Sequence, residues 1–185
     1  MNYLKKYDFL TPDECDKIIE IILSKENQIK QLGPDNYPGT NTNSLTGRYY
    51  CFNFLSIESI NSIIAPKLKE IFGPCTVQCW ANTFRRGEGI AEHTHVTERT
   101  ACPEYYASAN IFLCGDPTIG TYYEGVKHES KPGQLTIFPP NMLHGVIKNP
   151  TDKIRISMAF DIYIGSEKYM KMRALKEPWR YIFIK

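Results

Sequence analysis

The chain has 185 residues, of which 42% are hydrophobic and 23% are charged, and its formal net charge is +2. This composition is typical of one folded domain with a sizeable core, so residues 1–185 are expected to form a single domain. The near-neutral charge gives no strong field of one sign, so tight binding to nucleic acid is not expected. The sequence contains neither an apolar run of membrane-spanning length nor the apolar segment of a secretory signal near its start. We therefore expect a cytoplasmic (intracellular) protein with no membrane contact, whose six cysteines are reduced and mostly buried.

The N-terminal part, residues 1–73, is predicted to be mainly helical. Thr11 can cap the first helix, Pro12 suits its first turn, and Glu14 stands at the third position of a capping box. Apolar residues at helical spacing follow, and the helix is expected to fade near Lys25.

A loop rich in Gly, Pro, Asn and Thr is expected at 31–46, and an aromatic strand at 47–55. A second helix follows, with a kink or restart at Pro66, and it ends at Gly73.

From residue 75 the pattern changes to short strands separated by turn residues. We predict strands at about 75–85, 90–96, 105–114, 119–124, 134–139, 144–148 and 153–164. The C-terminal tail, 165–185, is expected to hold a short helix and an apolar end-piece. Helices followed by strands indicate an α+β plan, in which the strands at 75–164 close into a barrel or sandwich and the helices cover one sheet.

Three of the four histidines indicate a metal site. His93 and His95 stand two residues apart, so on a strand both side chains point to one face. His144 follows a turn after a predicted strand, a place from which a barrel can bring it back to the pair. Imidazole ligands suit iron, zinc, copper and nickel. The alternative is that His93 and His95 lie in a surface loop, or that one is buried and the other exposed.

Alternation along the strands gives two interpretations of their polar faces. The strand at 153–164 has an apolar face and a second face that carries Arg155, Ser157, Ala159 and Asp161. The second face is either solvated or lines the interior of a barrel. A solvated face would use Lys and Glu, whereas the strands before it offer aromatic, amide and hydroxyl side chains. We therefore favour a ligand cavity lined by Trp80, Asn82, Tyr106, Ser108 and Asn110.

Arg155 is a candidate anion site within this cavity. An arginine stays protonated, so inside a cavity it needs an anionic partner. Its guanidinium suits a carboxylate, and the Ser157 hydroxyl can add a further hydrogen bond. A dicarboxylic acid would fit. The alternative is that Arg155 only pairs with Asp152 or Asp161.

These residues resemble a known family. His93-Thr94-His95, then residues 133–140 leading to His144, then Arg155-Ile156-Ser157, resemble the motifs of the 2-oxoglutarate- and iron(II)-dependent oxygenases. Prolyl-hydroxylase-like and phage-type members are most similar, and residues 9–15 resemble the start of their first helix. The resemblance implies a double-stranded β-helix (a jelly-roll, cupin-like barrel) with two N-terminal helices packed on one sheet. It also implies a hydroxylase that uses Fe(II), 2-oxoglutarate and O₂ on a peptide or small-molecule substrate and releases succinate and CO₂.

The resemblance also implies roles for particular residues. His93 corresponds to the first metal ligand and His144 to the distal ligand. Arg155 and Ser157 correspond to the residues that hold the far carboxylate of 2-oxoglutarate. Asn82 and Asn110 are candidates for the other carboxylate or for the substrate. These roles come from the resemblance together with the predicted cavity.

The sequence departs from the family at one ligand. His95 stands where the family has a carboxylate, and we expect it to be the third ligand. A three-histidine site carries one more positive charge than the usual triad, which should weaken retention of the cation. Two alternatives remain: Glu98 completes the site with His95 behind it, or His95 is the first ligand and Thr97 takes the carboxylate position.

Two other functions stay open at this point. One is a cupin-like three-histidine dioxygenase that uses no oxoacid, and the other is a metal- or ligand-binding barrel without catalysis. Neither the substrate nor the oligomeric state is evident from the sequence.

Overall fold

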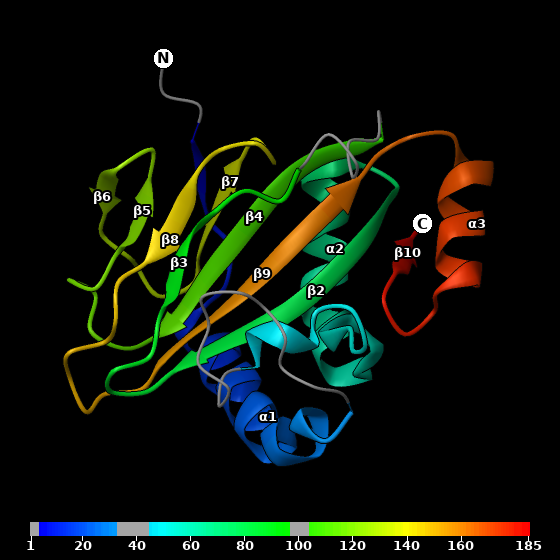
Figure 1. Cartoon of the computed structure of the whole chain (residues 1–185). Coiled ribbons are helices and arrows are strands. Elements are labelled where there is room, and N and C mark those ends of the chain that lie inside the picture. The colour runs from blue at the N-terminus through cyan, green and yellow to red at the C-terminus, as the bar shows by residue number, and fades with distance from the viewer. Residues whose placement is uncertain (1–3, 33–44, 97–103) are drawn as a thin grey trace.

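The computed structural model describes residues 4–32, 45–96 and 104–185, and in these ranges it contains three α-helices and two β-sheets (Figure 1). In chain order the elements are β1 (Lys5–Asp8), α1 (Pro12–Lys30), the 3-10 helices η1 (Thr46–Arg48) and η2 (Phe54–Ser56), α2 (Glu58–Phe72), β2 (Cys75–Phe84), β3 (Ile90–His93), β4 (Tyr105–Cys114), β5 (Thr121–Tyr123), β6 (Val126–His128), β7 (Gln134–Phe138), β8 (His144–Val146), β9 (Arg155–Tyr163), α3 (Glu167–Lys176) and β10 (Ile182–Ile184).

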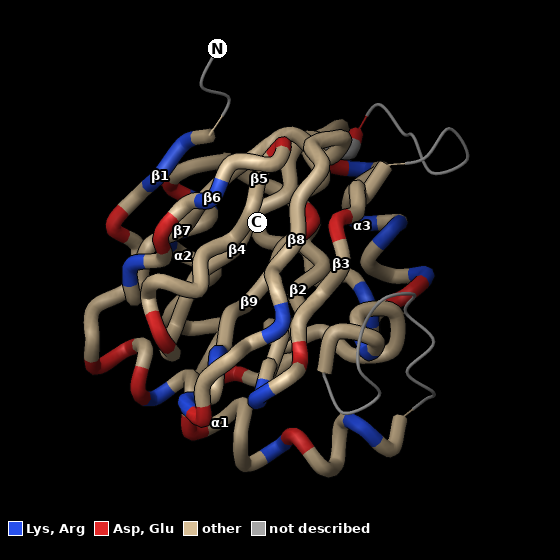
Figure 2. Tube along the Cα trace, turned by 60° about the vertical axis from the view of Figure 1, so that its left-hand side comes forward, with Lys and Arg blue, Asp and Glu red and all other residues tan. Residues whose placement is uncertain are grey.

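The strands form two antiparallel sheets that face one another. The major sheet has the order β1-β7-β4-β9-β2-β10, and the minor sheet has the order β3-β8-β5-β6. The minor sheet lies to the left of β4 and β9 in Figure 1 and in front of the major sheet in Figure 2. Two facing antiparallel sheets with helices outside one of them form an α+β double-stranded β-helix. The predicted fold class is therefore confirmed.

The two N-terminal helices cover the outer face of the major sheet, as expected. Ile18 and Ile22 of α1 and Ile60, Ile64 and Leu68 of α2 are fully buried. They share one hydrophobic core with the outward-facing residues of the central strands. Figure 1 shows α1 and α2 on the side of β2 and β9 away from the minor sheet. Burial of this face leaves the opposite face of the sheet for a ligand.

Strand β9 shows how the sequence separates the two faces. Ile156, Met158, Phe160 and Ile162 are fully buried in the hydrophobic core. The alternate residues, Arg155, Ser157, Ala159 and Asp161, line a cavity between the two sheets. Since successive side chains on a strand point to opposite faces, one strand contributes to both. The interpretation of the polar face as a cavity lining is therefore confirmed for β9.

Tyr106 does not line this cavity, contrary to the prediction. The pairing of β4 with β9 shifts register between Tyr105 and Ala107. A bulge of this kind turns a side chain away from its regular alternation. Tyr106 is 59% exposed, and its ring lies against Phe72 of α2. Asn110, beyond the bulge, lines the cavity as expected. Ser108 is not among the lining residues; it is fully buried against His95 and Asp161.

The predicted strand at 47–55 is wrong. This segment forms η1 and η2 instead. Between them Asn53 is buried, and its side-chain amide donates to the backbone oxygens of Val77 and Arg180. Contacts distant in sequence therefore override the aromatic, strand-like composition.

Helix boundaries also differ from the prediction. Helix α1 continues five residues past the expected end, to Lys30, because Glu26 is buried in an ion-paired cluster with Lys30 and Arg85. Pro66 lies within α2 without ending it. Each of the seven strands predicted from residue 75 onward overlaps an observed strand. Strands β1 and β6 were not predicted. The C-terminal end-piece, expected only to be apolar, contains β10.

Other features of the described residues agree with composition. Positive and negative side chains are mixed along the trace (Figure 2). The five cysteines in the described ranges are free thiols, and Cys15, Cys75 and Cys79 are buried. None of the described helices combines the length and hydropathy that a membrane span requires.

Candidate functional site

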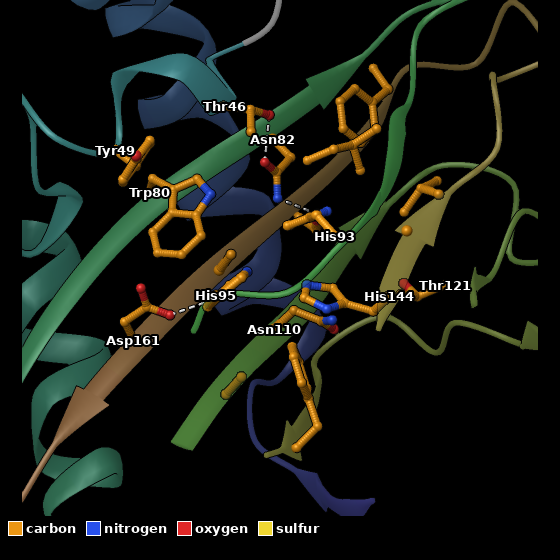
Figure 3. A pocket seen from close by; sticks show the side chains of 18 of the residues that line it. Thr46, Tyr49, Trp80, Asn82, His93, His95, Asn110, Thr121, His144 and Asp161 are labelled. Atoms are coloured by element: carbon orange, nitrogen blue, oxygen red, sulfur yellow. Dashed lines mark hydrogen bonds and ion pairs between the residues drawn. The ribbon is translucent and has the colours of Figure 1, made fainter. Parts of the chain in front are cut away.

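A cavity of about 260 Å³ lies between the two sheets (Figure 3). Its floor comes from β2, β4 and β9 of the major sheet, and its roof from the minor sheet and the segment that follows β3. The lining residues are Thr46, Tyr49, Trp80, Asn82, Phe84, Ile90, His93, Thr94, His95, Ala109, Asn110, Thr121, Phe138, His144, Gly145, Val146, Arg155, Ser157, Ala159 and Asp161. Most of the site residues predicted from sequence therefore lie in a single cavity.

Backbone pairing brings the three histidines together. His93 stands directly opposite His144 in the β3–β8 ladder, and their ring centroids are 4.4 Å apart. Strand β3 ends at His93, but the backbone N–H of His95 donates to the Pro140 carbonyl oxygen, just before β8. The His95 ring lies 5.3 Å from that of His93 and 4.8 Å from that of His144. One candidate ligand atom from each ring lies within 4.8 Å of the other two.

Oxygen partners at Nδ1 make Nε2 the candidate metal-binding atom of all three rings. Nδ1 of His93 lies 2.9 Å from the Ala91 carbonyl oxygen, and Nδ1 of His144 lies 2.9 Å from that of Met142. Nδ1 of His95 lies 2.6 Å from a carboxylate oxygen of Asp161. Because these oxygens accept, each Nδ1 acts as the donor, and in a neutral ring Nε2 is then the atom that can bind a metal. This second hydrogen bond is the usual support of a metal-binding histidine.

Burial keeps two of the rings neutral. Burial, together with the neighbouring histidines, lowers the pKa of His93 to about 4 and that of His144 to about 2. A neutral imidazole is the form that binds a metal. Both rings are therefore ready to act as ligands at neutral pH.

Arg155 is a buried cation without a carboxylate partner among the described residues. It is 2% exposed, and burial lowers its pKa to about 10, so it remains charged at neutral pH. Its guanidinium donates to the Ile119 carbonyl oxygen and to the hydroxyls of Ser157 and Thr121. The alternative considered from the sequence, an ion pair of Arg155 with Asp152 or Asp161, does not occur. Asp152 pairs with Arg86, and Asp161 pairs with His95.

The two asparagines lie in the cavity but are already hydrogen-bonded. Asn82 accepts from the Thr46 hydroxyl at 2.6 Å and donates to Ser157 at 3.4 Å (Figure 3). Asn110 donates to the Tyr123 hydroxyl at 2.6 Å. Asn82 therefore belongs to a chain of polar contacts that ends at Arg155, while Asn110 lies beside the histidines.

Asp161 was not predicted as a site residue. Sequence alternation placed it on the cavity face, and its only suggested role was to pair with Arg155. Its carboxylate instead accepts from His95 and from the Ser108 hydroxyl, at 3.1 Å for the latter. Sequence alternation put Asp161 and Ser108 on the polar faces of their strands, but it gave no signal that these two strands, β9 and β4, are neighbours.

Glu98 and Thr97, the residues of the two alternative ligand sets, lie outside the described residues. Within the described ranges, the cluster of candidate ligands consists of His93, His95 and His144. Three imidazole nitrogens suit iron, cobalt, nickel, copper or zinc. The donor set therefore fits an iron(II) ion.

No family model and no curated protein matches the sequence. Solved structures do match the fold. The viral collagen prolyl hydroxylase of Paramecium bursaria Chlorella virus-1, in a 2-oxoglutarate complex, has a TM-score of 0.56 and 16% identity, over 89% of this chain and 97% of that one. The chain has the fold of the prolyl hydroxylases.

Two further structures share this fold. A nickel complex of the non-heme monooxygenase ThoJ has a TM-score of 0.60 and 17% identity, over 87% of this chain and 73% of that one. A prolyl hydroxylase from Trichoplax adhaerens, in complex with a peptide of hypoxia-inducible factor, has a TM-score of 0.57 and 12% identity, over 95% of this chain and 87% of that one. In this prolyl-hydroxylase fold, the histidines and Arg155 share the cavity between the sheets.

Proposed function

We propose that the protein is a 2-oxoglutarate- and Fe(II)-dependent dioxygenase that hydroxylates a peptide or small molecule and releases succinate and CO₂. One observation carries the proposal: three histidine Nε2 atoms and a buried arginine without a carboxylate partner among the described residues line the same cavity. Solved structures of the same fold include a 2-oxoglutarate complex and a nickel complex, which supports both halves of this site.

In this proposal, individual residues of the chain have the following roles. His93, His95 and His144 hold the iron, which when bound supplies the redox chemistry that activates O₂. Arg155 and Ser157 bind the far carboxylate of 2-oxoglutarate. The surrounding apolar side chains exclude water, which strengthens the attraction between the guanidinium and the carboxylate.

The substrate is expected to bind on the side of the cavity formed by Tyr49, Trp80 and Thr46. Trp80 and Tyr49 pack with ring centroids 5.8 Å apart, and Trp80 lies 5.6 Å from His95. These rings offer an apolar surface next to the metal ligands, away from Arg155. The peptide bound by the Trichoplax hydroxylase supports a peptide as one class of substrate.

The anchor role of Arg155 can be tested separately from catalysis. Arg155→Ala should weaken 2-oxoglutarate binding to the Zn(II)-loaded protein by about 10- to 100-fold, because charge-assisted hydrogen bonds to the carboxylate are lost. Isothermal titration calorimetry measures this change. Arg86→Ala removes an exposed arginine outside the cavity and should leave the affinity unchanged.

The proposed reaction is tested by succinate formation. The protein with Fe(II), O₂, ascorbate and 2-oxoglutarate should release succinate, and candidate peptides that are substrates should increase the rate. If Arg155→Ala bound 2-oxoglutarate as tightly as the wild type, the proposed role of Arg155 in carboxylate binding would be refuted. If the wild type bound no 2-oxoglutarate, the oxoacid-dependent function would be refuted.

One observation favours a second candidate, a cupin-like dioxygenase that uses no oxoacid. The described ligand cluster consists of three histidines without a carboxylate. Such an enzyme should consume O₂ with a thiol or diketone when loaded with iron, without 2-oxoglutarate. A barrel that binds metal without catalysis would show neither activity.

A further inference from the structure

Asp161 lies directly behind one of the candidate metal ligands. Its carboxylate accepts a hydrogen bond of 2.6 Å from Nδ1 of His95 (Figure 3). The Ser108 hydroxyl lies 2.9 Å from the same Nδ1 and donates to Asp161 at 3.1 Å. The side chains of His95 and Asp161 are only 9% and 11% exposed.

Three central strands position this group. In the major sheet Asp161 of β9 stands directly opposite Gln78 of β2 on one side and opposite Ser108 of β4 on the other. Residues opposite one another in a sheet keep a fixed spacing. Asp161 therefore occupies a defined position in the most extensively paired part of the fold.

Asp161 also contributes a negative charge near the candidate metal ligands. A ligand set of two histidines and one carboxylate carries one negative charge, which three neutral histidines lack. Among the described lining residues, Arg155 and Asp161 are the charged side chains apart from the histidines. Asp161 thus supplies one negative charge to the site. Its carboxylate is hydrogen-bonded to the ligand His95, whereas the carboxylate of the usual ligand set would contact the ion directly. It also fixes the His95 tautomer and increases the basicity of its Nε2.

We propose that Asp161 is a positioning residue of the metal centre, and that its carboxylate, acting through His95, replaces the charge of the missing carboxylate ligand. The inference rests on the metal site of the proposed function, but not on 2-oxoglutarate or on turnover. It accounts for how a three-histidine site retains a divalent cation.

The test measures Co(II) and Ni(II) binding by calorimetry, together with the visible absorption spectrum of the Co(II) protein. Asp161→Asn keeps the size of the side chain and an oxygen that can accept from His95, but removes the charge. It should weaken metal binding by about 10- to 100-fold, the range found when such outer partners are removed. The melting temperature of the metal-free protein should change little, because the charge acts mainly on the bound cation.

Two controls make the result specific. Asp152→Asn removes an exposed carboxylate that pairs with Arg86 outside the cavity, and metal affinity should not change. Asp161→Glu restores the negative charge, and it should bind Co(II) more tightly than Asp161→Asn. If Asp161→Asn fails to fold, Asp161→Glu is compared with the wild type instead, and the expected result is a Co(II) affinity close to that of the wild type.

The outcomes separate this inference from the proposed function. If the wild type binds Co(II) and Asp161→Asn binds it equally well, the role of Asp161 is refuted while the metal centre stands. If Asp161→Glu binds no better than Asp161→Asn, charge is not the cause. A wild type that binds neither Co(II) nor Ni(II) would overturn both the metal centre and the inference.

Discussion

Each histidine of the candidate metal centre has its own oxygen partner. Backbone carbonyls fix the rings of His93 and His144, and a carboxylate fixes that of His95. The fourth histidine, His128, has no place in this arrangement: it is half-buried in β6 and lies outside the cavity. A place in the cavity and an oxygen partner at Nδ1 therefore distinguish the three candidate ligands from His128.

We predict that His144→Ala abolishes tight metal binding. The ring supplies one of three Nε2 donors, and the two remaining imidazoles hold a divalent ion much less firmly. Affinity for Ni(II) should fall by at least about 100-fold, a larger loss than for an outer partner. Equilibrium dialysis with metal analysis measures the change. His128→Ala is the matched variant, and retention of full affinity in His144→Ala would contradict the assignment.

At the level of single residues, the sequence pattern predicted which face of a strand a side chain occupies better than it predicted which residue that side chain contacts. Arg155, Ser157 and Asn82 lie in the cavity as expected. The pairing of Asp161 with His95 was not predictable, because it joins residues 66 positions apart whose contact depends on which strands are neighbours. Tyr106 was misplaced because a bulge is invisible in an alternating pattern.

Two short strands, β3 and β8, bring His93 and His144 face to face, and a glycine permits their close approach. A Cβ atom at Gly145 would lie 2.9 Å from the backbone nitrogen of Glu92 and 3.0 Å from the carbonyl oxygen of Ile90. Both of these atoms belong to the β3 backbone, which cannot move aside as a flexible side chain would. The geometry of the metal site therefore depends on the absence of a side chain at position 145.

Gly145→Ala is expected to push β3 away from β8 and to separate the two rings. Metal affinity should fall by about tenfold or more, and overpacking should cost roughly 1–3 kcal/mol of stability. Calorimetric Ni(II) titration and chemical denaturation measure the two effects. Gly125→Ala has open space around it but is strained by its φ of 76°, so it controls for a loss of stability without crowding between β3 and β8. The same affinity in both variants would argue against a role for the close approach.

At the level of elements, periodicity located the central strands because they are long and have two distinct faces. Strand β1 gave no such signal, since all four of its residues are exposed and it is held by backbone pairing with β7. The segment at 47–55 has the aromatic composition of a strand, but side-chain hydrogen bonds from Asn53 fold it into turns. Elements defined by long-range contacts were the ones that sequence did not predict.

Across the whole molecule, a buried ion pair joins the helical layer to the major sheet. Glu26 of α1 is 5% exposed and accepts from Arg85, just beyond β2, at 2.9 and 2.8 Å. Burial raises the pKa of Glu26, but hydrogen bonds and charge from Arg85 and Lys30 outweigh it, and the pKa falls to about 2. The ionised carboxylate is therefore favoured in the folded state.

This shift predicts a particular pH dependence of stability. Because the folded pKa is lowered, the contribution of Glu26 is complete above its unfolded value near 4.5 and is lost as pH falls toward 2. Glu26→Gln should lower the free energy of unfolding at pH 7 by up to about 3 kcal/mol, and the difference from wild type should shrink below about pH 4. Urea denaturation at several pH values tests this. Glu20→Gln, an exposed position on α1, should show no such convergence.

The overall fold was predictable because its signals repeat. Two helices with apolar stripes precede a series of alternating strands, and the two-sheet plan follows from the need to bury both sets of apolar faces. The strand order was not predictable from periodicity, because pairing between β4 and β9 or β3 and β8 depends on contacts across long stretches of chain.

The two ends of the cavity differ in exposure. Arg155, Ser157 and Thr121 are at most 6% exposed, whereas His93 and Tyr49 are half-buried. A dicarboxylic acid that reaches Arg155 must pass the histidines before a substrate covers them. We therefore expect a compulsory kinetic order in which the acid binds first, and inhibition at high substrate concentration, because a substrate that arrives early blocks the route inward.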